Sequence, residues 1–263
     1  MTSTSWEGRH PGRWESWAFD FFTAGASLGG FVGLSFHPDL RRCWYWAALV
    51  GDRRRYLLVR DLDVPLPRLA ASREIRSEAL WADMNCETPF EHWSIGLEAF
   101  GVAMDDPDEA LRTERGERLG LGLDIEWEAV GEIEGAEGSY EQPGIVHGEV
   151  LVGGAGVETI AFEGHGWRRH AWGDPPCDGP DRPGSPEGML APRSWLGGRL
   201  DDGTPHRLQS VGHDVDIEAL HRAPLLLEAD VGEAILERWL CRFRDPSVGG
   251  GTGWVEWTTP RPR

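Results

Sequence analysis

The chain has 263 residues and a formal net charge of −18, and its basic residues are all arginine. This length suits one large domain or two domains of about 100–150 residues. A surface this acidic repels phosphate groups, which argues against nucleic acids and anionic membrane surfaces as partners.

The four cysteines, Cys43, Cys86, Cys177 and Cys241, are widely separated and form no CxxC pair. A chain this long does not need them as a disulfide framework, which favours a reducing compartment. Residues 1–16 lack the apolar core of a secretory signal, and no run approaches the roughly 18 apolar residues of a membrane span. The sequence therefore predicts a cytoplasmic protein without membrane insertion, and it leaves the oligomeric state open.

Alternation of apolar and polar residues, which is typical of half-buried strands, dominates the first half of the chain. Residues 44–50 and 56–60 predict two strands joined by a tight turn, and residues 75–85 predict one long strand. Residues 106–111 predict a short helix with an acidic first turn. The clearest strand covers residues 119–127, where every second side chain is a large apolar one.

The second half of the chain continues this pattern. Residues 145–152 and 158–162 predict one hairpin, and residues 193–200 and 206–211 predict another with an Asp-Asp-Gly turn. Residues 235–243 fit either a helix face or a strand face, and the strand-rich surroundings favour a strand.

Two segments have the composition of linkers. Residues 131–139 are rich in Gly and Glu, and residues 173–192 hold six prolines and four glycines. The first predicts a boundary between two all-β lobes, residues 1–134 and 135–263. The second predicts a long surface loop within the second lobe.

Familiar catalytic and nucleotide-binding motifs are absent, and the nine histidines lack the close spacing of a metal site. We therefore expect neither a metal nor a cofactor. The densest polar and aromatic cluster covers residues 164–173. In an extended strand His170 and Trp172 share one face, about 6–7 Å apart, which sets an imidazole beside an aromatic plate. The alternative is a sheet-end cluster whose Arg and His side chains satisfy loop carbonyls.

A second cluster places carboxylates among aromatic residues. Glu87 and Glu91 lie near Trp81, His92 and Trp93 in the sequence. A carboxyl group buried in an apolar cavity has a raised pKa and can act as a general acid near neutral pH. Alternatively, each glutamate pairs with an arginine and fixes a corner of the fold.

Aromatic and histidine side chains further along the chain complete the set of candidate ligand contacts. Tyr140 and His147 lie where the second lobe is expected to begin, and Trp195 lies on a predicted strand of that lobe. The face of a tryptophan ring stabilises positive charge that develops in a substrate.

Four segments in the same order resemble the carotenoid 1,2-hydratase and AttH-like superfamily, especially an uncharacterised actinobacterial-type branch. The resemblance covers nearly the whole chain. Its segments are Glu15-Ser16-Trp17 with Phe19 and Phe21-Phe22, residues 81–101, Tyr140-Glu141-Gln142-Pro143 with His147-Gly148-Glu149, and Gly164-His165-Gly166 with Arg169-His170-Ala171-Trp172-Gly173.

The resemblance implies two consecutive lipocalin-like β-barrels packed against each other, with a ligand cavity near their junction. It also implies functional roles for His170 and Trp172, which match the His-x-Trp motif of the hydratases. The chain departs from the usual pattern at Arg169, where an Asp is usual, and at Ala171, where a Ser is usual. No tyrosine follows Tyr140, so the downstream Tyr of the hydratases has no counterpart.

Three functions follow as hypotheses. The first is an enzyme that hydrates, isomerises or cyclises a small apolar unsaturated molecule, such as a terpenoid, a steroid-like ring or a polyene or polyketide, by proton transfer in a Trp-rich cavity. Its expected catalytic residues are His170, Trp172, Glu87 and Glu91. The second is a binding or carrier protein for a small hydrophobic molecule, without turnover. The third is a structural protein whose barrels are filled with side chains.

Overall fold

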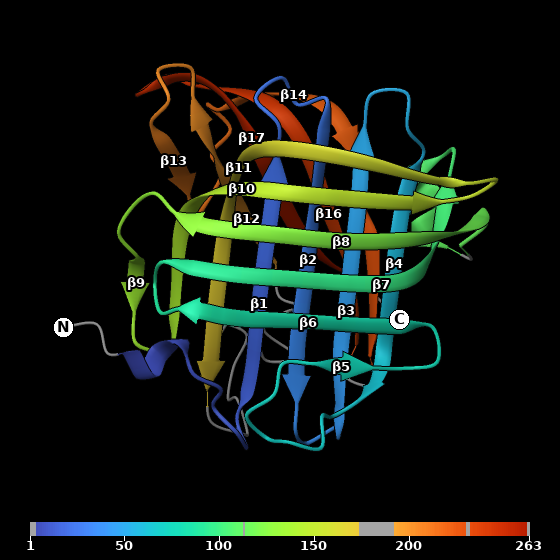
Figure 1. The fold of residues 1–263 in the computed structure, drawn as a ribbon. Coiled ribbons are helices and arrows are strands. Elements are labelled where there is room, and N and C mark those ends of the chain that lie inside the picture. Colours follow the sequence, from blue (N-terminus) through green and yellow to red (C-terminus); the bar gives the residue numbers. More distant parts are fainter. Residues whose placement is uncertain (1–3, 113, 174–191, 230–231, 262–263) are drawn as a thin grey trace.

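A computed structural model describes residues 4–112, 114–173, 192–229 and 232–261 (Figure 1). These residues form two antiparallel sheets and only two short 3-10 helices, η1 (Thr4–Glu7) and η2 (Pro107–Leu111). The all-β prediction is confirmed. No helix within the described ranges has the length and apolar character needed to cross a membrane.

The first sheet closes on itself. Its strands in pairing order are β4 (Tyr56–Pro65), β3 (Arg42–Gly51), β2 (Leu28–His37), β1 (Trp14–Phe22), β11 (Val157–Gly173), β10 (Ser139–Gly153), β8 (Glu117–Ala129), β7 (His92–Met104), β6 (Leu80–Thr88) and β5 (Ile75–Arg76), with β9 (Glu134–Ala136) beside β10. Because β4 pairs with both β3 and β7, the strands from β4 to β7 in pairing order form a ring of eight. In Figure 1, β1 to β4 cross behind β6, β7, β8 and β10 at a steep angle, as in a small closed barrel.

The second sheet packs on the outside of this barrel, against the wall that contains β1 to β4 (Figure 1). Tyr56 Oη donates to the carbonyl of Pro224 at 2.8 Å, and Trp254 Nε1 donates to the carbonyl of Phe21 at 3.0 Å. Over the described residues this sheet is open. Its strands in pairing order are β13 (Pro205–Leu208), β12 (Arg193–Leu200), β17 (Gly249–Arg261), β16 (Gly232–Asp245) and β14 (Asp216–Arg222), with β15 (Leu225–Ala229) beside β16.

The division between the two sheets differs from the lobe boundary expected after residue 134. Strands β10 and β11 pair with β8 and β1, so the first sheet extends to Gly173. The composition of residues 131–139 predicts a linker, but these residues contain the short strand β9, which pairs with β10.

Most predicted strands are confirmed, including residues 235–243, which lie within β16. The strand predicted over residues 75–85 is interrupted by a turn between β5 and β6. In this turn the backbone amide of Ser77 donates a hydrogen bond to the carbonyl of Leu80. The helix predicted over 106–111 is the 3-10 helix η2, capped by the Asp106 side chain. The loop predicted over 173–192 lies almost entirely outside the described residues.

The barrel interior is filled with apolar side chains. Phe19, Ile125 and Trp127 belong to a large buried cluster, and the void beside them measures only about 10 Å³. A second buried cluster fills much of the space between the barrel wall and the second sheet. A ligand of any size must therefore bind elsewhere than in the middle of the barrel.

Tryptophans and glycines are abundant here partly because they pack together. The ring of Trp46 lies against Gly33 on the neighbouring strand, and Trp195 lies against Gly197. A Cβ atom at either glycine would overlap the indole. Glycine therefore occurs within strands, where its lack of a side chain leaves room for an indole ring, as well as in the turns expected from its frequency.

Candidate functional site

His170 lies at the centre of a row of three strands at one end of the barrel. In register, Trp17 of β1 lies opposite it on one side and Tyr140 of β10 on the other. Its ring stacks on Trp17, with the ring centroids 4.5 Å apart, and lies 4.7 Å from the ring of Trp172. The prediction that His170 and Trp172 face the same side is therefore confirmed.

A buried acid completes this site. Glu15 Oε1 lies 3.0 Å from His170 Nε2, and Tyr140 Oη lies 3.2 Å from His170 Nδ1. The side chains of Glu15 and His170 are fully buried. We name the group Glu15, Trp17, Tyr140, His170 and Trp172 the barrel-end cluster.

The N-terminal segment covers the barrel-end cluster. Trp6 stacks on Tyr140, and His10 stacks on Trp172 with ring centroids 4.4 Å apart. Glu7 forms a bidentate ion pair with Arg168, with Nη2–Oε1 and Nη1–Oε2 distances of 2.5 and 3.1 Å, and both side chains are buried. Residues 6–10 therefore close this end of the barrel.

Burial sets the charge of the central pair. It raises the pKa of Glu15 to about 7, although the positive charge of Arg9 opposes the change. Burial also lowers the pKa of His170 well below its ordinary value, and the nearby positive charge of Arg168 adds to this effect. At neutral pH the imidazole is therefore neutral, and the carboxyl group is present in both its protonated and its ionised form.

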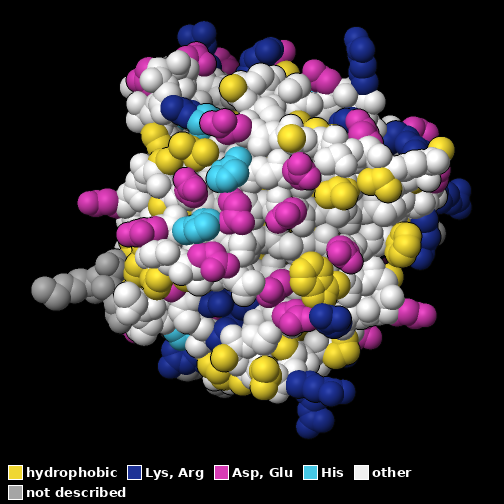
Figure 2. All heavy atoms as spheres, in the orientation of Figure 1, with side chains coloured by type: hydrophobic (Ala, Val, Ile, Leu, Met, Phe, Trp, Pro, Cys, Tyr) yellow, Lys and Arg dark blue, Asp and Glu magenta, His cyan; other side chains and the backbone are white. Residues whose placement is uncertain are grey.

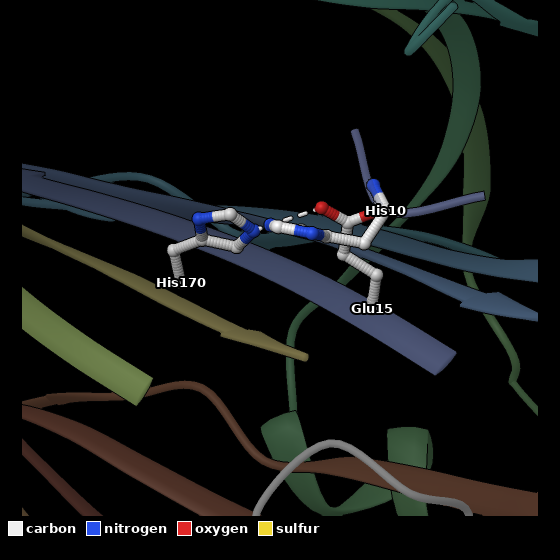
Figure 3. A group of neighbouring side chains, drawn as sticks. All are labelled: His10, Glu15 and His170. Carbon is white, nitrogen blue, oxygen red and sulfur yellow. Dashed lines mark hydrogen bonds and ion pairs between the residues drawn. The ribbon is translucent and has the colours of Figure 1, made fainter. Parts of the chain in front are cut away.

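The donor atoms of His10, Glu15 and His170 lie within 4.8 Å of one another (Figure 3). Two histidines and a carboxylate are a ligand set that zinc accepts. Here, however, Glu15 is bonded to Arg9 as well as to His170, and the positive charge of Arg73 acts on both residues of that pair. Since these charges repel a cation, the arrangement fits a hydrogen-bonded acid–base pair better than a metal centre.

Other residues predicted for the site lie elsewhere. Glu87 and Glu91 are exposed, so burial does not make either of them a general acid. Glu87 accepts a hydrogen bond from Ser94 Oγ at 2.8 Å. The physical reason lies in the chain geometry, because both residues belong to the solvent-facing end of the β6–β7 hairpin.

Alternation along the strands explains the positions of the remaining predicted residues. Trp93 points into the barrel, where the guanidinium groups of Arg73 and Arg168 lie 4.9 and 5.6 Å from its ring. Trp81, His92 and His147 occupy the opposite phase, and their side chains lie on the outer face. Figure 2 shows this face, on which acidic side chains and histidines gather over β8 and β10.

Trp195 lines a separate cavity of about 320 Å³ between the barrel wall and the second sheet. We name it the junction cavity. Trp46, Leu236 and Ala171 add apolar surface to its wall. His170 also borders it, but alternation turns the imidazole into the barrel, so only the backbone of His170 can face the cavity.

Charged residues from both sheets form one side of the junction cavity. Arg169, Arg193 and Arg238 surround Glu256, whose side chain is 1% exposed. Their charges lower the pKa of Glu256, although burial opposes this. Arg169, which departs from the resembled motif, thus ties the barrel to the second sheet.

Sequence reasoning missed Glu15 as a site residue. The alternation along this strand indicates Glu15, because it lies on the same face as Trp17 and Phe19, both of which are apolar and buried. An acidic residue in the core phase of a strand indicates a buried carboxyl group.

Comparison with protein families gives one match. The family described as "Domain of unknown function (DUF7064)" matches residues 3–211. No curated protein sequence matches the chain.

Three solved structures are similar to the chain. A protein from Nitrosomonas europaea, provisionally assigned as AttH, is 13% identical over 94% of this chain and 92% of its own, with a TM-score of 0.50. Kievitone hydratase from Nectria haematococca is 10% identical over 95% and 89%, with a TM-score of 0.46. CghA in complex with Sch210972 is 9% identical over 94% and 88%, with a TM-score of 0.49. The likeness to the first protein supports the lipocalin-like fold expected from the sequence. The expected pairing of two barrels is not shown, because the second sheet is open over the described residues.

Proposed function

Since the chain belongs to the DUF7064 family, whose function is unknown, we propose from its geometry that it binds a small, largely apolar molecule in the junction cavity. The observation that carries this proposal is the 320 Å³ cavity walled by Trp46 and Trp195. This volume equals that of about ten water molecules and lies at the lower end of the range for ligand pockets. A compact molecule of one or two rings fits within it, whereas a long polyene extends beyond it.

Binding can be tested with a neutral probe. β-Ionone, a terpenoid ketone with one ring, should quench the tryptophan fluorescence of the protein in a saturable manner. Replacing Trp195 by Phe should weaken binding several-fold, because the cavity loses part of its apolar wall. The matched control is Trp257→Phe, since Trp257 packs in the separate apolar cluster of the second sheet and does not line the cavity. Equal binding by all three proteins would refute the proposal.

A second candidate function is proton-transfer catalysis on an unsaturated molecule of the same class. It is favoured by the Glu15–His170 pair, in which an acid with a pKa of about 7 contacts a neutral imidazole. In a hydration, the carboxyl group of Glu15 protonates an alkene carbon, water adds to the resulting cation, and the proton that water loses returns to the pair. The rings of Trp17 and Trp172 stabilise the positive charge.

The barrel-end cluster is closed, so this reaction requires the N-terminal segment to move away from it. Catalysis of proton transfer can be measured as deuterium uptake from D₂O into β-ionone and related enones, followed by mass spectrometry. Wild-type protein should accelerate the uptake, and Glu15→Gln should abolish the acceleration. Glu87→Gln is the matched control, because Glu87 is exposed. Binding of β-ionone without any accelerated exchange would favour the carrier function.

A further inference from the structure

Three arginines of the junction cavity share acidic partners, and Arg193 makes one hydrogen bond to them. Arg169 forms a bidentate pair with Glu256, with N–O distances of 3.2 and 2.8 Å, and Arg193 Nη2 contacts the same carboxylate at 3.2 Å. Arg238 Nη2 donates to Asp20 at 2.8 Å. Three guanidinium groups therefore share two carboxylates, and guanidinium groups stay charged in proteins.

One donor in this group has no acceptor. Arg193 Nε is buried and makes no hydrogen bond with any described residue, whereas Arg238 Nε lies 3.4 Å from Glu256 Oε2. The side chain of Arg238 is 2% exposed and lines the cavity with Arg193. Burying an arginine donor without an acceptor is costly, so a ligand oxygen that reaches Arg193 would be favoured.

The other acid in the cavity is held by other partners. Glu141 accepts hydrogen bonds from Trp195 Nε1 and Arg207 Nη1, each at 2.9 Å. Arg207 also pairs with Glu134, so Glu141 keeps negative charge that acts on Arg169 and Arg193. The unpaired Nε donor of Arg193, rather than an excess of positive charge, is therefore the feature that points to a ligand.

We propose that the junction cavity selects molecules bearing a carboxylate, with Arg193 and Arg238 as its charged contacts and Trp46 and Trp195 against the apolar part of the ligand. The proposal deepens the binding function given above by naming the ligand class. Planar, forked guanidinium groups match a carboxylate better than an ammonium group does.

Matched pairs of probes test this selectivity. Benzoate and benzamide, and 1-naphthoate and 1-naphthamide, are nearly equal in shape within each pair and differ in charge. Isothermal titration calorimetry at neutral pH should show that the carboxylate of each pair binds about tenfold more tightly, or better. Equal affinities within both pairs, or no binding of either carboxylate, would overturn the proposal.

Variants locate the source of the preference. Arg193→Gln should reduce it to near unity, and Arg193→Lys should retain part of it. Arg193 is preferred over Arg238 for this test because its side chain is 29% exposed, so folding tolerates the change more readily. The control is Arg242→Gln, which alters an exposed arginine on the same strand as Arg238. An equal loss of preference in the Arg193→Gln and Arg242→Gln variants would overturn the assignment.

The outcome is separable from the two functions proposed above. Suppose that β-ionone binds, that Trp195→Phe weakens its binding, and that each carboxylate binds no more tightly than its amide. The cavity then binds ligands without selecting carboxylates. Glu15→Gln should leave the carboxylate preference intact, because Glu15 lies on the opposite face of the barrel wall from the cavity. Loss of the preference in Glu15→Gln would contradict the assignment of the preference to Arg193.

Discussion

Glu15 and His170 form a buried pair whose pKa values are shifted in opposite directions, with 3.0 Å between Glu15 Oε1 and His170 Nε2. Burial favours the uncharged form of each group, which raises the pKa of the acid from 4.5 to about 7 and lowers that of the base below 6.5. Where the pH lies between 4.5 and 6.5 and above the lowered pKa of His170, the folded pair is Glu–COOH with neutral imidazole. The unfolded pair is a carboxylate with imidazolium. Both states hold one proton, so the pair adds no pH dependence to stability in this window.

Removing either residue of the pair should reveal how the other residue makes the unfolding free energy depend on pH. Glu15 alone favours the folded state below pH 4.5, and this contribution is lost as the pH rises to about 7. His170 alone disfavours the folded state at low pH, and this cost disappears as the pH rises to 6.5. Relative to wild type, the unfolding free energy of Glu15→Gln should therefore rise with pH, by up to about 1.4 kcal/mol per pH unit. That of His170→Asn should fall.

Urea denaturation at several pH values between 4.5 and 6.5 measures these slopes. Glu126→Gln serves as the control, because Glu126 and its partner His92 are each 36% exposed and solvent weakens their interaction. Parallel pH profiles for Glu15→Gln, His170→Asn and wild type would show that Glu15 and His170 do not form a buried, uncharged pair.

The ion pair between Glu7 and Arg168 should hold the N-terminal segment over the barrel-end cluster. Both partners are at most 2% exposed, so Glu7→Gln leaves the buried positive charge of Arg168 without its paired carboxylate. We expect a loss of about 3–5 kcal/mol in unfolding free energy. The exposed pair Arg55–Glu117 is the matched control, and Glu117→Gln should cost about 0–1 kcal/mol. Equal costs for the two variants would argue that residues 4–10 do not dock as described.

Zinc should not bind stoichiometrically to the set His10, Glu15 and His170. A metal ion at this position must displace Arg9 from Glu15 and approach two further arginines, which costs electrostatic free energy. We expect the melting temperature to be the same with a chelator and with added zinc, because a ligand that binds only the folded state would raise it. One zinc ion per chain retained after dialysis, and lost in His10→Ala, would contradict this prediction.

The sequence predicted the fold better than the site, because strand alternation is a local signal. Residues 119–127 and 145–152 lie in strands as expected, and their apolar phase faces the barrel interior. The extent of the first sheet could not be predicted in this way. It depends on the pairing of β11 with β1, which lie more than a hundred residues apart in the chain.

The site depends on the same long-range pairing. Motif reasoning found His170 and Trp172, which are neighbours on one strand. It did not find Glu15, because its contact with His170 spans 155 positions in the sequence. Glu87 and Glu91 were favoured as acids because aromatic residues flank them in the sequence. Both are exposed at a hairpin end, where neighbours in sequence do not bury a side chain.

Gly33 should be indispensable for the position of Trp46 in the junction cavity. The two residues are paired across β2 and β3, and a Cβ atom on Gly33 would overlap the indole ring. Gly33→Ala should therefore displace Trp46, lower the unfolding free energy by about 1–3 kcal/mol and weaken the binding of β-ionone. The control is Gly120→Ala on another strand, where the nearest atoms to an added Cβ lie 3.8 Å away. Thermal denaturation and fluorescence titration of both variants provide the measurement. If Gly33→Ala proves as stable as Gly120→Ala and binds β-ionone like wild type, then the seating of Trp46 on Gly33 does not shape the cavity.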